Sequence, residues 1–290
     1  MMGAIIGDIV GSVYEWNNIK TKEFPLFQER CFFTDDTVMT IAVAEAVMNG
    51  GSDEDFIAAM KKYGRMYPNA GYGGRFGGWI FSDDNKPYNS WGNGAAMRVS
   101  PCGWAMNCGF TARTGIWPSN GQDMAKRSAA VTHNHPEGIK GAAAVADAIF
   151  ICRLYSGKFY GDYDTQPMIP TIADCKKMVC EHTESEYGYD LSKTLDEIRP
   201  AYRFNESCQD TVPQAVTAFL ESADFEDAIR NAISLGGDSD TLAAITGSIA
   251  EAAYGIPQWI IDKAWTYLDE PLKDVCRRWH EAMKGWKAGN

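Results

Sequence analysis

The stretch DDTVMTIAVAEAVMNGG, residues 35–51, shows the structural period that dominates the chain. It opens on aspartate and threonine side chains that favour a helix N-terminus, and it stops at the pair Gly50-Gly51. Between these ends, Val38, Ile41 and Ala42 recur at the spacing of one helix face. The stretch therefore predicts an α-helix whose first two residues are both acidic.

The same period recurs in most of the remaining chain. Ser52 and an acidic first turn predict a helix that ends before Pro68, and a second helix is expected from near Pro136 to Gly157. Further helical patterns cover residues 171–186, 212–221, 224–234, 241–254, 257–268 and 271–285.

Alternating strand patterns do not recur, so the fold class is expected to be all-α. The Gly/aromatic-rich stretches at 69–79 and 87–104 indicate loops between helices rather than linkers between domains. No repeat of fixed period is found. Residues 1–290 are therefore expected to form a single compact multi-helix domain.

Composition narrows the classes of partner. The chain has 290 residues, of which 45% are hydrophobic and 22% charged, as is typical of a globular protein with a substantial core. A net charge of -11 argues against a nucleic-acid or anionic-membrane surface, and no stretch has the length of a membrane span. The N-terminal run carries Asp8 and no basic residue, unlike a signal peptide. Eight cysteines without a C-x-x-C pair indicate free thiols in a reducing cytoplasm. For the oligomeric state, a monomer is the default expectation.

Asp35 and Asp36 need a source of positive charge if they are buried, because an ionised carboxylate without a partner is costly to remove from water. Neither Lys nor Arg occurs between Arg30 and Lys61. Two explanations are open at this point. Either the stretch bends out to solvent, or another group supplies the positive charge.

A second acidic helix start occurs in GGDSDTLAAITGSIAEAAYG, residues 236–255. Asp238, Asp240 and Thr241 precede small and aliphatic residues, and this stretch also lacks Lys and Arg. The pattern therefore repeats that of the first cluster.

Helix capping explains each cluster taken alone, since Asp and Thr are preferred N-cap residues. One cap needs only one side chain, however, and each cluster offers three oxygen ligands. Such ligands suit Mg²⁺ or Mn²⁺ rather than zinc, and converging carboxylates would repel one another unless divalent cations intervened. If the two helix starts meet, the sequence predicts a pair of metal ions. The candidate ligands are Thr34, Asp35, Asp36, Asp238, Asp240 and Thr241.

The N-terminal motif GAIIGDIVGSVYEW carries a third acidic candidate, Glu15. Gly3, Gly7 and Gly11 recur at four-residue spacing and give one helix face without side chains, so that another backbone can approach closely. Glu15 lies one step further along this stripe, whereas Asp8 lies off it. On spacing alone, a solvated position after the helix also explains Glu15.

Two further stretches are candidates for ligand contacts. SWGNGAAMRVSP, which begins at Ser90, places glycines before a short helix-like run, where phosphates can approach backbone N–H groups. It is neither a Walker A nor a Rossmann motif, and an ordinary glycine turn also explains it. In THNHPEG, His133 and His135 are better candidates for hydrogen bonding than for zinc, because no cysteine or third histidine accompanies them.

Taken together and in this order, the motifs resemble the ADP-ribosylglycohydrolase family, which includes the dinitrogenase-reductase-activating glycohydrolases of bacteria. The likeness extends from Gly3 to about Pro257. The second metal motif reads DSDT where DTDT is common, and Trp91 stands where some relatives have another aromatic residue. The matching stretches are GAIIGDIVGSVYEW, FTDDTVMT, PNAGYGGRFGGW, SWGNGAAMRVSP, THNHPEGIKGA and GGDSDTLAAITGSIAEAAYG.

The resemblance implies an orthogonal multi-helix domain with two divalent cations, Mg²⁺ or Mn²⁺, held by both acid/threonine clusters in a central cleft. Catalytic candidates are Glu15, Asp35 and Asp36, and Glu15 is preferred because a metal-bound carboxylate is held ionised. The residues expected to contact the substrate are Ser90, Trp91, Gly92, Asn93, Gly94 and His133.

The implied reaction is hydrolysis of the bond between C1 of the distal ribose of ADP-ribose and a protein side chain, or the same bond in a small ADP-riboside. The alternatives are an ADP-ribose-binding or toxin-immunity protein without turnover, and a two-metal phosphoesterase that cuts the diphosphate. Arginine and serine linkages are both open. Residues 158–170 and 184–211 are candidates for the border of the cleft.

Overall fold

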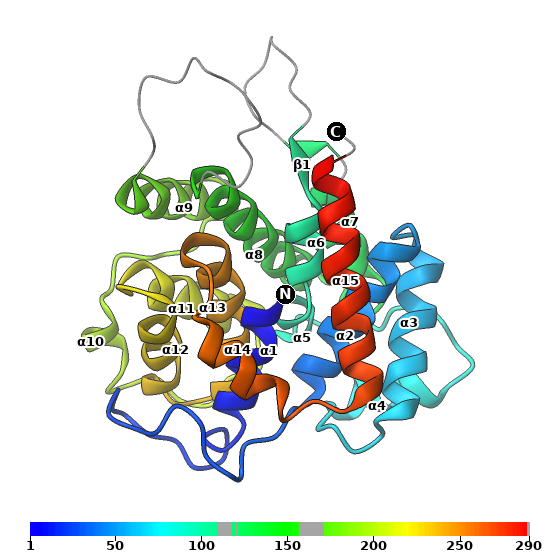
Figure 1. The fold of residues 1–290 in the computed structure, drawn as a ribbon, viewed down its shortest axis with the longest axis horizontal. Coiled ribbons are helices and arrows are strands. Elements are labelled where there is room, and N and C mark those ends of the chain that lie inside the picture. The colour runs from blue at the N-terminus through cyan, green and yellow to red at the C-terminus, as the bar shows by residue number, and fades with distance from the viewer. Residues whose placement is uncertain (109–117, 120, 157–170, 289–290) are drawn as a thin grey trace.

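Helices account for nearly all regular structure in the computed structural model, which describes residues 1–108, 118–119, 121–156 and 171–288 (Figure 1). Two two-residue strands, β1 (Asn107–Cys108) and β2 (Pro118–Ser119), form an antiparallel pair. The all-α prediction is therefore confirmed. The helices are α1 (Met2–Gly11), α2 (Asp35–Asn49), α3 (Asp53–Met66), α4 (Gly74–Phe81), α5 (Gly94–Met97), α6 (Ser100–Ala105), α7 (Gly121–Ala130), α8 (Pro136–Tyr155), α9 (Ile172–Tyr187), α10 (Leu195–Ile198), α11 (Cys208–Leu220), α12 (Phe225–Ser234), α13 (Ser239–Tyr254), α14 (Gln258–Trp265) and α15 (Glu270–Ala288).

Every helix expected from the periodic pattern is present, with shifted ends, but the loop predictions at 69–79 and 87–104 are wrong in part. The first contains most of α4, and the second contains α5 and most of α6. α4 has glycines at three of its positions and thus weak intrinsic helix propensity. Its buried Phe76, Trp79 and Ile80 instead stabilise the helix through tertiary packing. α7 and α10 were not predicted.

Helix α1 lies in the middle of the molecule against α13 (Figure 1). The stripe of Gly3, Gly7 and Gly11 makes this contact possible. A Cβ atom on Gly3 would lie 2.1 Å from the Gly247 carbonyl oxygen, and one on Gly7 would lie 2.0 Å from the Ala243 carbonyl oxygen. The two backbones are therefore in direct contact. This contact places the residues of α1 next to the acidic start of α13.

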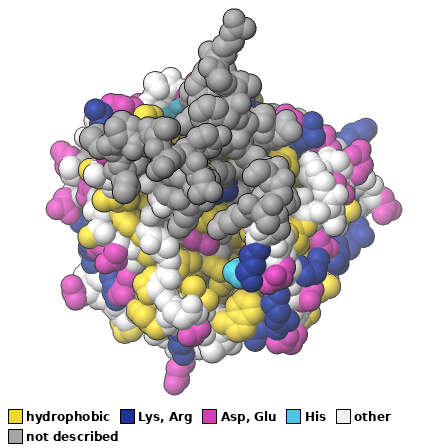
Figure 2. All heavy atoms as spheres, turned by 45° about the horizontal axis from the view of Figure 1, so that its top comes forward, with side chains coloured by type: hydrophobic (Ala, Val, Ile, Leu, Met, Phe, Trp, Pro, Cys, Tyr) yellow, Lys and Arg dark blue, Asp and Glu magenta, His cyan; other side chains and the backbone are white. Residues whose placement is uncertain are grey.

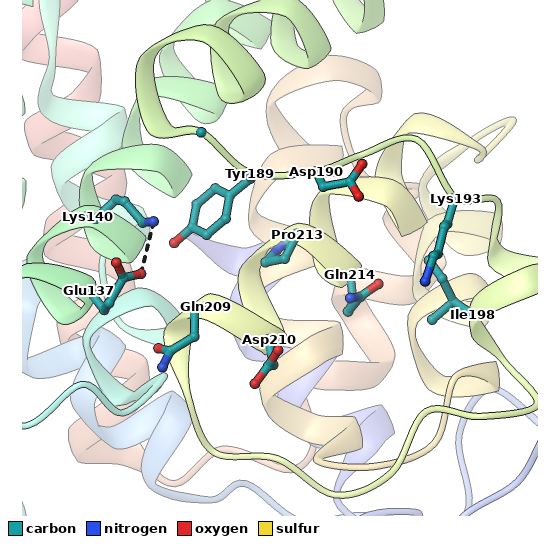
Figure 3. A pocket seen from close by; sticks show the side chains of 11 residues that line it. Glu137, Lys140, Tyr189, Asp190, Lys193, Ile198, Gln209, Asp210, Pro213 and Gln214 are labelled. Carbon is teal, nitrogen blue, oxygen red and sulfur yellow. Dashed lines mark ion pairs between the residues drawn. The ribbon is translucent and has the colours of Figure 1, made fainter.

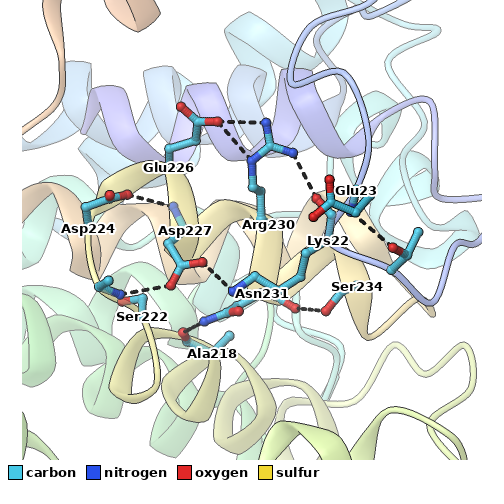
Figure 4. Close-up of polar contacts among 12 residues, drawn as sticks. Lys22, Glu23, Ala218, Ser222, Asp224, Glu226, Asp227, Arg230, Asn231 and Ser234 are labelled. Atoms are coloured by element: carbon cyan, nitrogen blue, oxygen red, sulfur yellow. Dashed lines mark hydrogen bonds and ion pairs between the residues drawn. The ribbon is translucent and has the colours of Figure 1, made fainter.

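The segment between α1 and α2 is fixed to α12 (Figure 4). The Arg230 guanidinium donates hydrogen bonds to the carbonyl oxygens of Lys22 at 2.9 Å and Phe24 at 2.7 Å, and it pairs with Glu226. Lys22 forms an ion pair with Asp227. These bonds hold the irregular chain that leads from α1 to the acidic start of α2.

Charged side chains of both signs are interspersed around the face shown in Figure 2, and hydrophobic side chains gather toward its middle. Each helix within the described residues is too short or too polar to cross a bilayer.

Candidate active site and metal centre

The site is built on the start of α2, which Asp8 of α1 holds in place. One Asp8 oxygen, Oδ2, accepts hydrogen bonds from the backbone N–H groups of Thr34 at 2.9 Å and Thr37 at 3.0 Å. The other, Oδ1, accepts from the Thr34 hydroxyl at 2.7 Å. The Thr34 hydroxyl oxygen in turn caps the helix by accepting from the N–H of Asp36. Asp8 therefore fixes the direction of α2, a role that its spacing did not reveal.

The two acidic helix starts converge. The Thr241 hydroxyl donates a hydrogen bond to Asp36 Oδ2 at 3.2 Å, which joins the start of α13 to that of α2. Two sets of three carboxylates bring their oxygens within 4.8 Å of one another, and Asp240 belongs to both. The sets are Asp8, Asp36 and Asp240, and Glu15, Asp238 and Asp240.

Burial and mutual repulsion raise the pKa values of these carboxyl groups. Burial raises the pKa of Asp8 to about 6, although hydrogen bonds from the two threonines oppose it. Burial and then the charges of Asp238 and Asp8 raise the pKa of Glu15 to about 7. The pKa of Asp240 is well above its ordinary value for the same two reasons. Without a counter-charge, the cluster cannot hold all its negative charges at neutral pH.

The donor set fits hard divalent cations. The converging atoms are carboxylate oxygens, and Asp36 Oδ1 is buried without a hydrogen-bond partner. Two cationic residues, Arg75 and Arg98, line the same cavity, but each donates a hydrogen bond to a backbone carbonyl oxygen rather than to a carboxylate. Arg75 donates to the Tyr88 carbonyl oxygen at 2.5 Å, and Arg98 donates to the Ser128 carbonyl oxygen at 2.9 Å. The described residues therefore form a cluster that could hold metal.

The carboxylates open into a cavity of about 250 Å³. Its lining includes Glu15, Asp35, Asp36, Asp238, Asp240 and Thr241 on the acidic side, and Ser90, Gly92, Asn93, Gly94 and His133 on the other. Asn93 of the glycine loop connects the two sides, because its side-chain amide donates to Asp238 Oδ2 at 2.7 Å. Its backbone N–H donates to the Glu206 carbonyl oxygen at 2.7 Å.

The glycine loop lies over His133. A Cβ atom on Gly94 would lie 3.2 Å from His133 Nε2, and one on Gly92 would lie 3.4 Å from it. Burial, then the charges of Arg98 and Arg75, hold the pKa of His133 well below its ordinary value. The imidazole is therefore neutral and contacts Thr132 Oγ1 through Nδ1 at 2.8 Å. At this end of the cavity, the glycines let another group approach the backbone closely, and Arg75 and Arg98 supply two positive charges.

Most of the sequence-predicted residues thus lie in one cavity, with three qualifications. Asp35 lines it but belongs to neither set of three carboxylates. Thr34 is buried and bonded to Asp8. Trp91 is about half exposed and contacts the His135 ring edge-on at 5.8 Å, outside the lining.

The lining or supporting residues that sequence reasoning missed include Asp8, Arg75, Arg98, Phe204 and Glu206. Asp8 had a usable signal, since a lone charge inside an apolar helix must find buried partners. Phe204 and Glu206 fall in the stretch 184–211 that was expected to border the cleft, whereas 158–170 lies outside the described residues.

A second, larger hollow of about 530 Å³ lies between the start of α8 and the start of α11 (Figure 3). Its charged side chains are mixed in sign, and Lys140 is paired with Glu137 at 2.9 Å. Figure 3 shows the lining side chains spread around the hollow rather than converging on one point. No chemistry follows from this arrangement, and the candidate site is the acidic cavity.

The fold and the acidic cavity define a helical protein with a carboxylate-lined ligand site, and sequence comparison gives the family. The family model described as ADP-ribosylglycohydrolase matches residues 1–288. The chain therefore belongs to the ADP-ribosylglycohydrolase family and is a glycohydrolase.

Curated relatives agree with this assignment. The chain is 25% identical to ADP-ribosylarginine hydrolase Tri1 of Pseudomonas putida (strain GB-1), over 92% of this chain and 73% of the relative. It is 24% identical to ADP-ribosylhydrolase ARH3 of Homo sapiens, over 91% and 86%. A solved ADP-ribosylglycohydrolase-related protein complex superposes with a TM-score of 0.60 at 22% identity, covering 94% of each chain, which shows similarity of fold.

Proposed function

We propose that the protein hydrolyses the glycosidic bond at C1 of the distal ribose of ADP-ribose and releases ADP-ribose from modified protein side chains or from small ADP-ribosides. The observation that carries the proposal is the polarity of the cavity. Converging carboxylates form one side, and a glycine loop with Arg98 and His133 forms the other. A ribose among the carboxylates and a diphosphate at the loop would match both ends.

The metal-binding part of the proposal assigns two divalent cations, Mg²⁺ or Mn²⁺, to the carboxylate cluster. Asp36, Asp238 and Asp240 are the proposed carboxylate ligands, with Asp35, Thr34 and Thr241 as further oxygen donors. Bound divalent cations supply Lewis-acid polarisation and charge neutralisation to such a site. Asp8 is assigned to positioning, because both of its oxygens accept hydrogen bonds from the start of α2.

Glu15 is proposed as the group that moves a proton. It is only partly buried, so it can exchange a proton with solvent, and it converges with Asp238 and Asp240 in one of the two sets of carboxylates. The transition state of glycoside hydrolysis has oxocarbenium character, which the surrounding carboxylates stabilise electrostatically. The Ser90–Gly94 loop and His133 would hold the diphosphate and orient C1 toward Glu15.

The deciding experiment is to incubate the protein with ADP-ribosylated peptides and added Mg²⁺ or Mn²⁺ and to weigh the products by mass spectrometry. Hydrolysis at C1 gives intact ADP-ribose and unmodified peptide. AMP would instead indicate a phosphoesterase, and unchanged peptide that stays bound would indicate a reader or immunity protein. Either of these results would overturn the proposal.

A further inference from the structure

Two large aromatic side chains are stacked on each other at the mouth of the acidic cavity. Trp16 is 75% exposed and Phe204 is 39% exposed. Their ring centroids are 5.1 Å apart with an interplanar angle of 21°. Trp16 and Phe204 come from distant parts of the chain, so tertiary structure brings this exposed pair together. Exposed aromatic surface of this kind is typical of a binding site.

The pair is connected to the catalytic candidate. Phe204 lines the cavity, and Trp16 directly follows Glu15. The stacked rings therefore border the part of the cavity where Glu15 lies.

The proposed position of the substrate places the leaving group at this border of the cavity. If the ribose lies among the carboxylates and the diphosphate lies at Ser90–Gly94 and His133, adenosine extends beyond that loop. The bond at C1 then faces Glu15. A group attached to C1 would extend along Trp16 and Phe204.

The chemistry of this border suits a planar cation. Aromatic faces attract guanidinium groups, which also stack on them. The acidic residues Glu15 and Glu206 line the same cavity as Phe204. Two cations occur nearby, but Lys20 donates to the carbonyl oxygens of Tyr202 and Leu235, and Arg203 donates to those of Pro200 and Tyr202. Neither of them lines the cavity.

We propose that Trp16 and Phe204 form the leaving-group subsite and select a guanidinium, so that arginine-linked ADP-ribose is preferred over the serine-linked form. This inference rests on the proposed hydrolysis. In that reaction the C1–N bond breaks, water adds its hydroxyl to C1, and the departing guanidine nitrogen takes up a proton. A serine oxygen offers the rings no planar cation.

The test compares kcat/KM for two peptides of the same sequence, one modified on arginine and one on serine. We expect the arginine-to-serine ratio to exceed one in the natural protein and to fall by about three- to tenfold in Trp16→Ala and in Phe204→Leu. Trp16→Phe keeps an aromatic face, so it should keep most of the ratio. Trp259→Ala, which removes another exposed tryptophan outside the lining, should leave both rates unchanged.

Three results would overturn the inference: a natural preference for serine, an equal loss on both linkages, or weakened binding of free ADP-ribose in both ring variants. The last result would assign the rings to the adenine base. Calorimetry with agmatine, a guanidinium without ADP-ribose, tests the subsite separately from turnover. If the natural protein binds agmatine and Trp16→Ala does not, but neither peptide is hydrolysed, the subsite stands and the proposed function fails. If agmatine does not bind although arginine-linked peptide is hydrolysed, the subsite assignment fails alone.

Discussion

Asp240 is the residue on which the carboxylate cluster depends, because it belongs to both sets of converging oxygens. Its backbone also lies against α1, where a Cβ atom on Gly11 would be 2.4 Å from Asp240 Cα. The side chain is buried, so its position is determined by the packing of two helices rather than by a surface rotamer. Removal of this single carboxylate would leave both sets incomplete.

We therefore expect Asp240→Ala to lower ADP-ribose release at least about 100-fold, since loss of groups in a metal site has large effects. Binding of Mn²⁺, measured by calorimetry or by electron paramagnetic resonance, should be lost or strongly weakened. The helical circular dichroism signal should be retained. Asp262→Ala, which removes an exposed aspartate of α14, is the control and should behave like the natural protein. Full activity of Asp240→Ala would exclude this cluster as the active site.

A second prediction at this scale separates proton transfer from ligand binding. Glu15→Gln keeps the size and hydrogen-bonding capacity of the side chain but cannot exchange a proton. We expect kcat to fall by about 10²- to 10⁴-fold, with ADP-ribose affinity little changed. Single-turnover assays and calorimetry measure the two quantities. A variant that loses affinity to the same degree as rate would show that Glu15 acts in binding.

At the scale of helices, the contact of α1 with α13 positions three of the acidic groups. Gly7 is central to it, because a Cβ atom there would meet backbone atoms of Ala243 and Ala244 at 2.0 to 2.6 Å, too close for either backbone to accommodate. Asp8 and Glu15 are carried by, or directly follow, the same helix. Any widening of this contact would move both away from Asp240.

Gly7→Ala should accordingly destabilise the protein by about 1–3 kcal/mol or more and lower its melting temperature, because overpacked cores respond in this range. Gly78→Ala is the matched control within a helix, since a Cβ atom there would meet nothing within 4 Å. It should be neutral or stabilise by up to about 1 kcal/mol. Equal melting temperatures for the two variants would mean that the backbone contact is not tight.

The difference between local sequence signals and tertiary packing explains which parts of the fold and of the site could be predicted from the sequence. The starts of α2 and α13 were predictable because caps, acidic first turns and apolar periods are local signals. α4 was not, because its glycines lower helix propensity and only the packing of Trp79 and Ile80 compensates. The convergence of Asp36 with Asp240 and the pairing of Trp16 with Phe204 depend on residues about two hundred positions apart, which no local pattern encodes.

For the whole molecule, the cavity concentrates negative charge in a protein that already carries a net charge of -11. Burial, then the surrounding carboxylates, raise the pKa of Asp35 to about 8 and that of Asp36 well above its ordinary value. Each such group binds protons more tightly in the folded protein than in the unfolded chain. Folding stability therefore falls as the pH rises through the interval between the unfolded and folded pKa values.

The metal-free protein should consequently lose melting temperature between about pH 6.5 and pH 8, the upper value being the pKa of Asp35. Stability falls with rising pH because of the raised pKa values of four carboxyl groups, those of Glu15, Asp35, Asp36 and Asp240. The lowered pKa of His133 has the opposite effect on stability, but mainly below pH 6.5, the ordinary pKa of histidine. The buried amino terminus, whose pKa is lowered from its ordinary value of 8.0, also opposes the carboxyl groups, but it is a single group. Scanning calorimetry across this range, in chelator, measures the net slope.

Added Mg²⁺ or Mn²⁺ should raise the melting temperature more at pH 8 than at pH 6.5, because cations bind the ionised cluster and compete with its protons. Asp240→Asn should flatten the pH dependence of the metal-free protein, since it removes one of the titrating charges and the repulsion it exerts on Asp36. A melting temperature that rises with pH in chelator, or a metal effect that is the same at both pH values, would show that these carboxyl groups are not coupled to folding in the way their burial requires.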